Sequence, residues 1–330
     1  MPAIIAHYLM SKASAKSLSN KEVFENIKQH SSIFYLGAQG PDILLFALGN
    51  KELNALGERM HREGIKSFYS ECINRLRKTS IHDGRGELSA YMAGFLCHYA
   101  LDTCTHPYIY YKTGFSDEDG NLDIESTIRH RFFETTIDCI LSNHLDDKDP
   151  FSQNVFEKIS IASKKRVLIG KFLSDVIASS YNVFIYPEDL SKALKDIAFV
   201  YKMLSDKTGK KRAFAMKLSK VFRGIAPIAA LIHYTPVNTQ DYLNERRDVW
   251  YYPWDDAIDV NLSFMDLFIK AVEDSAIYIN AFEKTLQKQL DDKIALSILG
   301  NKNFSTGLES PVKFLYYNIE FNKFEGKRGI

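Results

Sequence analysis

Long stretches of this chain contain neither proline nor glycine, and this feature constrains the fold most strongly. The 330 residues include 9 Pro and 17 Gly, which is few for a β protein rich in loops. Apolar residues in these stretches recur at helical spacing, as Leu53, Leu56 and Met60 do. Alternating patterns typical of strands are few and short. The sequence therefore predicts an all-α protein.

The expected helices cover most of the chain, and proline and glycine mark several of their ends. In chain order they are 21–35, 51–78, 88–105, 124–141, 151–162, 165–179, 187–205, 210–223 and 262–295. Pro107 should end or kink the helix over 88–105 and push His106 away from helical dihedral angles. Residues 36–43 should form a loop, since Gly and Pro break regular structure there. The aromatic stretch 314–321 could be a strand or a docking tail.

The length fits one large domain or two small ones. We predict a single all-α domain over 1–330, with the metal ligands in 1–140 and a helical extension over 150–330. A polar loop at 144–150 is a weak boundary between these parts.

The composition is that of an ordinary globular protein, with 45% hydrophobic residues and a formal charge of +1. This charge gives no general attraction to nucleic acid. No apolar run approaches the roughly 20 residues that span a bilayer. The N-terminal sequence is not a convincing secretory signal, and the four cysteines show no C-x-x-C spacing. These features predict a cytoplasmic protein.

The most informative motif lies inside the expected helix over 88–105 and just after it. His98, Asp102 and His106 are spaced by four residues, which places them on one stripe of a helix. His98 and Asp102 could therefore reach one ion, and His106 could face a second. Asp102 is the only acid between residues 88 and 111, where there is no Lys or Arg. An ionised Asp in such a segment is costly to bury unless it is paired or bound to a metal.

Further histidines and acids accompany this motif. His130 and Glu134 have the same spacing on the next expected helix, and Asp42, His61 and His7 lie upstream. Imidazole and carboxylate ligands suit zinc, and eight of them would serve two or three ions. The alternative for any one histidine is a hydrogen-bonded core residue. An acid one helical turn away usually indicates a surface pair.

Taken together and in this order, these motifs resemble the zinc-dependent phospholipase C family, whose fold is shared with the single-strand-specific fungal nucleases. The motifs are His7, Gly40-Pro41-Asp42, Met60-His61, His98-Tyr99-Ala100-Leu101-Asp102, His106 and His130-Arg131-Phe132-Phe133-Glu134. Members of that family are all-α and hold three zinc ions at the bottom of a cleft.

The resemblance implies an assignment of ligands. One zinc would be held by Asp42, His61, His98 and Asp102; a second by His106, His130 and Glu134; and a third by His7, with Asp102 bridging to the first. Asp42 would also be the catalytic base that orients or deprotonates the attacking water. Two features differ from the secreted members. This sequence has no N-terminal Trp to complete the third site, and three residues rather than five separate Asp102 from His106.

The resemblance implies a zinc-dependent phosphodiester hydrolase. The expected substrate is a phospholipid, which would be cleaved to diacylglycerol and a phosphorylated headgroup, and no nucleic-acid partner is expected. Choline selectivity is not supported, because Ile43 and Glu58 are not aromatic. One alternative is a single-strand nuclease or nucleotidase on the same metals, which would need aromatic side chains that stack on bases. Another is a non-catalytic protein that binds zinc or lipid.

The segment 205–232 suggests peripheral contact with a membrane. Its first part, 205–223, has seven Lys or Arg and one acid, with interleaved apolar residues such as Phe214. Such a segment could be an amphipathic helix on anionic lipid. The more common explanation is a solvated helix face. The aromatic stretch 250–254 could likewise line the mouth of a cleft, although a place in the core or at a domain seam is more common for such a stretch.

Overall fold

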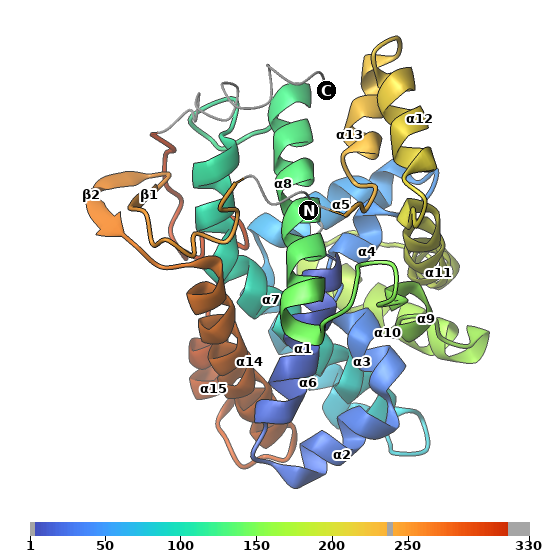
Figure 1. The fold of residues 1–330 in the computed structure, drawn as a ribbon. Helices are drawn as coiled ribbons and strands as arrows, with labels where there is room; N and C mark the ends of the chain where they lie inside the picture. The colour runs from blue at the N-terminus through green and yellow to red at the C-terminus, as the bar shows by residue number, and fades with distance from the viewer. Residues whose placement is uncertain (1–3, 236–239, 316–330) are drawn as a thin grey trace.

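The computed structural model describes residues 4–235 and 240–315, and helices dominate both ranges (Figure 1). The all-α prediction is confirmed. The sheet found in these ranges is one antiparallel hairpin of β1 (Trp250–Tyr252) and β2 (Asp255–Val260), which was not predicted. The stretch 314–321, expected to be a strand or a docking tail, lies mostly outside the described residues.

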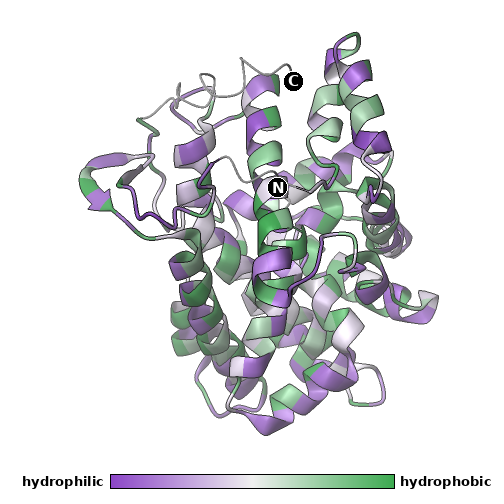
Figure 2. Cartoon of the chain, viewed as in Figure 1, coloured by the Kyte–Doolittle hydropathy of each residue, from purple (hydrophilic) through white to green (hydrophobic). Residues whose placement is uncertain are grey.

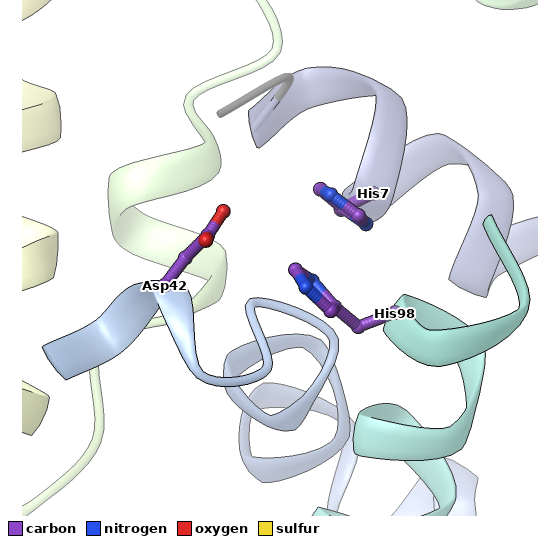
Figure 3. Close-up of side chains that lie close together, drawn as sticks. All are labelled: His7, Asp42 and His98. Atoms are coloured by element: carbon purple, nitrogen blue, oxygen red, sulfur yellow. The ribbon is translucent and has the colours of Figure 1, made fainter. Parts of the chain in front are cut away.

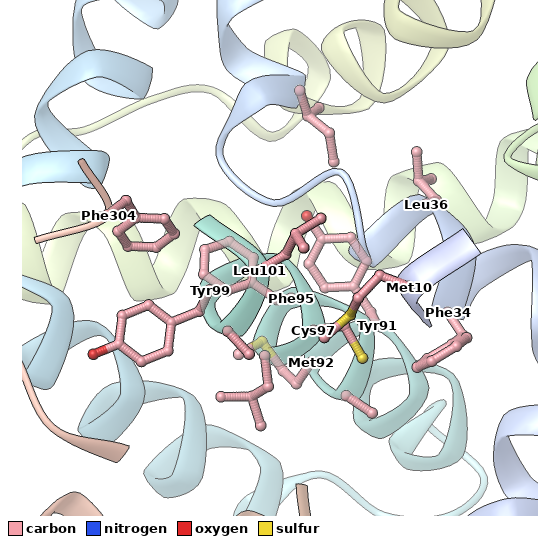
Figure 4. Packing of buried hydrophobic residues seen from close by; sticks show 14 of the residues in the cluster. Met10, Phe34, Leu36, Tyr91, Met92, Phe95, Cys97, Tyr99, Leu101 and Phe304 are labelled. Carbon is pink, nitrogen blue, oxygen red and sulfur yellow. The ribbon is translucent and has the colours of Figure 1, made fainter. Parts of the chain in front are cut away.

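Helix α7 (Arg85–Thr113) forms the centre of the molecule and is buried along nearly its whole length. Four helices pack against it most extensively. They are α1 (Ile4–Ser17), α3 (Ser31–Gly37), α8 (Ile124–Asp146) and α14 (Phe264–Leu286). Figure 4 shows the core along α7, where side chains from several of these helices meet. Figure 2 shows hydrophobic residues on these central helices and more polar ones on outer helices such as α2.

Two glycines allow α3 to cross α7 at very close range. A Cβ atom on Gly94 would lie 2.0 Å from the Phe34 carbonyl oxygen, and one on Gly37 would lie 2.1 Å from the Tyr91 carbonyl oxygen. No side chain fits at either position unless the backbones separate. This crossing holds the loop that follows α3 close to α7.

Three of the predicted helices are divided by caps that the periodicity of the sequence does not reveal. The prediction over 21–35 becomes α2 (Lys21–Gln29) and α3. The prediction over 51–78 becomes α5 (Lys51–Arg62) and α6 (Ile65–Lys78), which are separated by Gly64 in the left-handed conformation. The prediction over 262–295 becomes α14 and α15 (Asp292–Leu299), where Asp291 caps the second helix.

The prediction that Pro107 ends the central helix and displaces His106 is wrong, because α7 continues to Thr113. A proline within a helix removes the hydrogen bond to the carbonyl four residues earlier. That carbonyl belongs to Thr103, and Gly307 packs so closely against it that a Cβ atom would lie 2.3 Å away. Burial of Tyr108 and Ile109 beyond the proline stabilises the continued helix.

The remaining helices are short or lie around the centre. They are α4 (Asp42–Leu45), α9 (Val155–Lys158), α10 (Ser163–Tyr181), α11 (Pro187–Leu204), α12 (Lys210–Ser219), the 3-10 turn η1 (Arg223–Ile225) and α13 (Ala226–Ala229). Helix α4 begins at the end of the predicted loop, and α9 is the only helical part of the predicted stretch 151–162. Across the described ranges, no helix has the length and apolar character needed to cross a membrane.

Candidate metal centre

The structure brings all eight predicted metal-ligating side chains into one buried cluster. They come from five helices: His7 from α1, Asp42 from α4, His61 from α5, His98, Asp102 and His106 from α7, and His130 and Glu134 from α8. Each of these side chains is buried. So many ionisable groups are costly to bury together unless something binds them.

Asp102 lies at the middle of the cluster. Its Oδ1 atom is 3.2 Å from His7 Nε2, and its Oδ2 atom is 3.1 Å from His98 Nε2. The same Oδ2 atom is 3.7 Å from His106 Nδ1 and 3.9 Å from His61 Nε2. One carboxylate therefore faces four imidazoles, a geometry that suits a bridging ligand.

Three groups of side chains within the cluster could each hold a metal ion. They are His7, Asp42 and His98 (Figure 3); His61, His98 and Asp102; and His106, His130 and Glu134, and the ligand atoms of each group lie within 4.8 Å of one another. The third group matches the set that the resemblance implies for the second zinc. In the first group, the rings of His7 and His98 stack with centroids 4.1 Å apart, and Asp42 faces them. His7 therefore lies close to Asp42 as well as to Asp102.

A cavity of about 10 Å³ lies between these groups and is lined by His7, Asp42, Asp102, His106 and Glu134. This volume is close to that needed for a single water molecule. The cluster is therefore open enough at its centre for an atom to be bound between the groups.

The orientation of the histidines fits a metal centre. The Nδ1 atom of His61 lies 2.7 Å from the Gly57 carbonyl oxygen, and that of His98 lies 3.2 Å from the Ala38 carbonyl oxygen. A carbonyl can only accept, so each Nδ1–H donates, and in the neutral imidazole each Nε2 keeps its lone pair toward the cluster. Histidines that bind metals almost always donate their other ring N–H in this way.

Several atoms that face the cluster are buried without a hydrogen-bond partner among the described residues. They include Asp42 Oδ1, His61 Nε2 and His98 Nε2. His61 Nε2 is 3.1 Å from Asp42 Oδ1, but the two are not aligned as a hydrogen bond. Unsatisfied imidazole nitrogens and carboxylate oxygens are the ligands that zinc prefers, so the residues present fit this metal.

The electrostatics of the cluster favour charged acids. Burial raises the pKa of Asp102, but His98, His106 and His7 outweigh that effect and hold the pKa well below its usual value. Burial likewise opposes ionisation of Glu134, while His130 and His106 hold its pKa well below the usual range. Burial lowers the pKa of His130 to about 4, so this imidazole is neutral at neutral pH. Charged carboxylates beside a neutral imidazole are the protonation states that bind zinc.

Gly40, in the Gly-Pro-Asp motif, is expected to be required for the position of His98. Its φ of +52° favours glycine, and a Cβ atom there would lie 2.4 Å from the His98 ring. We expect Gly40→Ala to displace the imidazole and lower zinc affinity by about tenfold or more, as loss of an outer contact of a metal ligand does. Zinc titration of the purified variant measures this.

Gly49→Ala is a matched control, because Gly49 has a φ of +76° and nothing within 4 Å of the Cβ position. Both substitutions carry the cost of a positive φ, but only Gly40→Ala should reduce zinc affinity. Equal zinc affinity in the two variants would contradict the role given to Gly40.

Sequence reasoning missed Asp138, which holds the helix that carries His7. Asp138 is fully buried on α8 and accepts the backbone N–H groups of Ile5 at 2.9 Å and Ala6 at 2.8 Å. His233 Nε2 lies 3.3 Å from its Oδ2 atom. A signal was present, since Asp138 follows Glu134 by one helical turn. The pairing with His233 leaves no local signal, because the two residues are 95 positions apart in the sequence.

Asp138→Asn is expected to loosen α1 and destabilise the protein by about 2–3 kcal/mol, because the amide nitrogen would face a buried N–H and could not accept from it. Urea unfolding measures this loss. Asp146→Asn, which removes a partly exposed pair with Lys12 at the C-terminal end of α8, should cost less than about 1 kcal/mol. Similar losses in both variants would contradict the proposed anchoring of α1.

Phe304 was also missed, and nothing in its local sequence pointed to it. Its carbonyl oxygen lies 3.0 Å from His106 Nδ1, and its N–H donates to the His61 carbonyl oxygen at 2.9 Å. Its ring packs against the rings of His61 and His98. The backbone near residue 304 therefore orients His106 and supports two other candidate ligands.

Comparison with known protein families gives a match. The model of a family described as zinc dependent phospholipase C matches residues 1–191, more than half of the chain. All eight side chains of the cluster lie within the matched part. Comparisons with curated proteins and with solved structures found no match.

Proposed function

Because this chain belongs to the zinc-dependent phospholipase C family, a family of hydrolases that act on phospholipids, we propose that it cleaves a phospholipid to diacylglycerol and a phosphorylated headgroup. The observation that carries the proposal is the convergence of five buried histidines and three carboxylates beside an open cleft. That cleft has a volume of about 270 Å³, and His61, His106 and His130 line it. A substrate phosphate in the cleft would therefore reach candidate ligands of two metal groups.

We further propose two or three zinc ions, held as the family resemblance implies. Asp42, His61, His98 and Asp102 would hold one, and His106, His130 and Glu134 a second. His7 would hold a third together with Asp102. Bound zinc would neutralise charge on the phosphate and lower the pKa of a coordinated water to roughly 7.

Asp42 is the proposed base. Burial raises its pKa, but the neighbouring His61 and His98 outweigh burial and lower it below the usual value. The carboxylate is therefore ionised at neutral pH, and its unpartnered Oδ1 atom can accept a proton or hold a water in place. This role requires no covalent nucleophile from the protein.

Turnover of a short-chain phospholipid by the zinc-loaded protein tests the proposal. We expect hydrolysis that a chelator abolishes and added zinc restores. Faster cleavage of single-stranded DNA than of phospholipid would favour a nuclease and contradict the phospholipase assignment. A protein that is fully loaded with zinc but hydrolyses neither substrate would indicate a non-catalytic role.

We also propose that residues 205–232 contact a membrane surface. Helix α12 has no buried residue, and it lies with α13 at the periphery of the molecule (Figure 1). Val221 and Phe222 are 75% and 59% exposed in the connection between these helices, which also carries Lys220 and Arg223. Exposed apolar residues among cations are typical of segments that bind anionic lipid.

The position of this segment supports the proposal. The Pro227 carbonyl of α13 accepts a hydrogen bond from Arg131 at 3.3 Å, and Arg131 lines the cleft beside His130. A membrane in contact with residues 221–228 would therefore lie near the cleft.

Vesicle co-sedimentation tests the membrane contact. A double variant, Val221→Ser with Phe222→Ser, should bind phosphatidylglycerol vesicles on the order of tenfold more weakly, as expected when two apolar side chains are lost. Phe184→Ser is the control, because Phe184 is 64% exposed but lies between α10 and α11. Unchanged binding of the double variant would contradict the proposal.

A further inference from the structure

The wall of the cleft next to the candidate metal ligands is charged. Glu58 and Arg62 lie one turn apart at the end of α5, and Arg131 lies on α8; all three line the cleft of about 270 Å³. Arg62 follows His61 in the sequence, and Arg131 follows His130. These charged side chains therefore line the same cleft as His61 and His130, within reach of the headgroup of a phospholipid whose phosphate is bound there.

Both guanidinium groups can bind a ligand. Arg62 donates to Asn121 Oδ1 at 3.4 Å, and Arg131 donates to the Pro227 carbonyl oxygen. An arginine has five N–H donors, so each of these contacts leaves others for a ligand. Most of Arg131 is buried, where a cation binds an anion more strongly than it would in water.

Glu58 supplies the opposite charge. It is exposed to the cleft and lies near enough to Arg131 for its negative charge to raise the pKa of that guanidinium, against the larger lowering by burial. The lining thus presents two cations and one anion. A quaternary ammonium group is bound best by several aromatic faces, but Tyr110 is the only Phe, Tyr or Trp among the described lining residues.

We propose that this cleft selects phospholipids whose headgroup carries both a carboxylate and an ammonium group, as phosphatidylserine does. Arg62 and Arg131 provide the positive charge that a carboxylate requires, and arginine binds carboxylates through paired N–H groups. Glu58 provides the acceptor for the ammonium group. The inference rests on the proposed phospholipase function and names the substrate class of that site.

Turnover of matched short-chain lipids by the zinc-loaded protein tests the selectivity. The kcat/KM for phosphatidylserine should exceed that for phosphatidylcholine by about tenfold or more, the effect of one charge-assisted hydrogen bond. Arg62→Gln should lower kcat/KM about tenfold for phosphatidylserine and less than about twofold for phosphatidylcholine. Arg59→Gln is the control on the same helix, because Arg59 pairs with Glu63 instead, and it should change neither value.

Calorimetric binding of the free headgroups distinguishes failure of this inference from failure of the proposed function. Phosphoserine should bind the zinc-loaded protein more tightly than phosphocholine does, and Arg62→Gln should remove most of that difference. If no phospholipid is hydrolysed, the proposed function fails while calorimetry still decides the headgroup preference. The inference is overturned if phosphocholine binds as well as phosphoserine. It is also overturned if Arg62→Gln weakens both headgroups equally.

Discussion

Asp102→Asn is expected to reduce the zinc content of the protein and to lower kcat by more than about a hundredfold, because loss of a direct ligand should cost more than loss of an outer partner, which costs up to about a hundredfold. Asp102 faces His7, His98, His106 and His61 within 3.9 Å. An asparagine of the same shape would lose the negative charge that all four imidazoles share. Elemental analysis of the purified variant, together with turnover of a short-chain phospholipid, measures the effect.

Asp146→Asn is the control for this change of charge, because Asp146 pairs with Lys12 outside the cluster. It should retain the zinc content and kcat of the unmodified protein. If Asp102→Asn also kept its full zinc content, the proposed centre would have to be abandoned.

Gly94→Ala is expected to destabilise the protein by about 3 kcal/mol or more, at the upper end of the usual cost of overpacking a core. The new Cβ atom would lie 2.0 Å from the Phe34 carbonyl oxygen and 2.7 Å from the Ala38 nitrogen. Both neighbours are backbone atoms, so α3 and α7 would have to separate. This movement would also disturb the Ala38 carbonyl that orients His98. Denaturant unfolding measures the stability, and zinc titration measures the effect on the site.

Gly224→Ala is the matched control for Gly94, because no heavy atom lies within 4 Å of its Cβ position. Its stability should stay within about 0.5 kcal/mol of that of the unmodified protein. Similar stabilities of the two variants would show that α3 and α7 tolerate a wider separation than this structure implies.

Much of the fold was visible in the sequence because helical periodicity is a local signal. Helices α8, α10 and α11 lie close to their predicted ranges. Helix α1 was missed because its first two turns are buried on every side, so they show no polar face. The hairpin of β1 and β2 was missed because the aromatic stretch that begins it gives no alternating pattern.

The candidate ligands were visible in the sequence because their spacing is also a local signal. The residues that hold them in place were not visible, because they lie far away in the sequence. Each stripe of His and acid on α7 and α8 is set by spacing within one helix, so the sequence reveals it. The partners that orient these side chains come from distant parts of the chain. Asp138 contacts His233, which is 95 positions away in the sequence. His106 contacts Phe304, which is 198 positions away. Such contacts depend on the packed structure and leave no local pattern.

The contacts of Phe304 also affect how the protein could be shortened. The family match ends at residue 191, so a truncated protein that ended there would keep every candidate ligand. It would lose the carbonyl that fixes the tautomer of His106 and the N–H that holds the His61 carbonyl. A fragment cut at that residue would therefore be a poor minimal enzyme, and the shortest useful version of this chain must extend past residue 304.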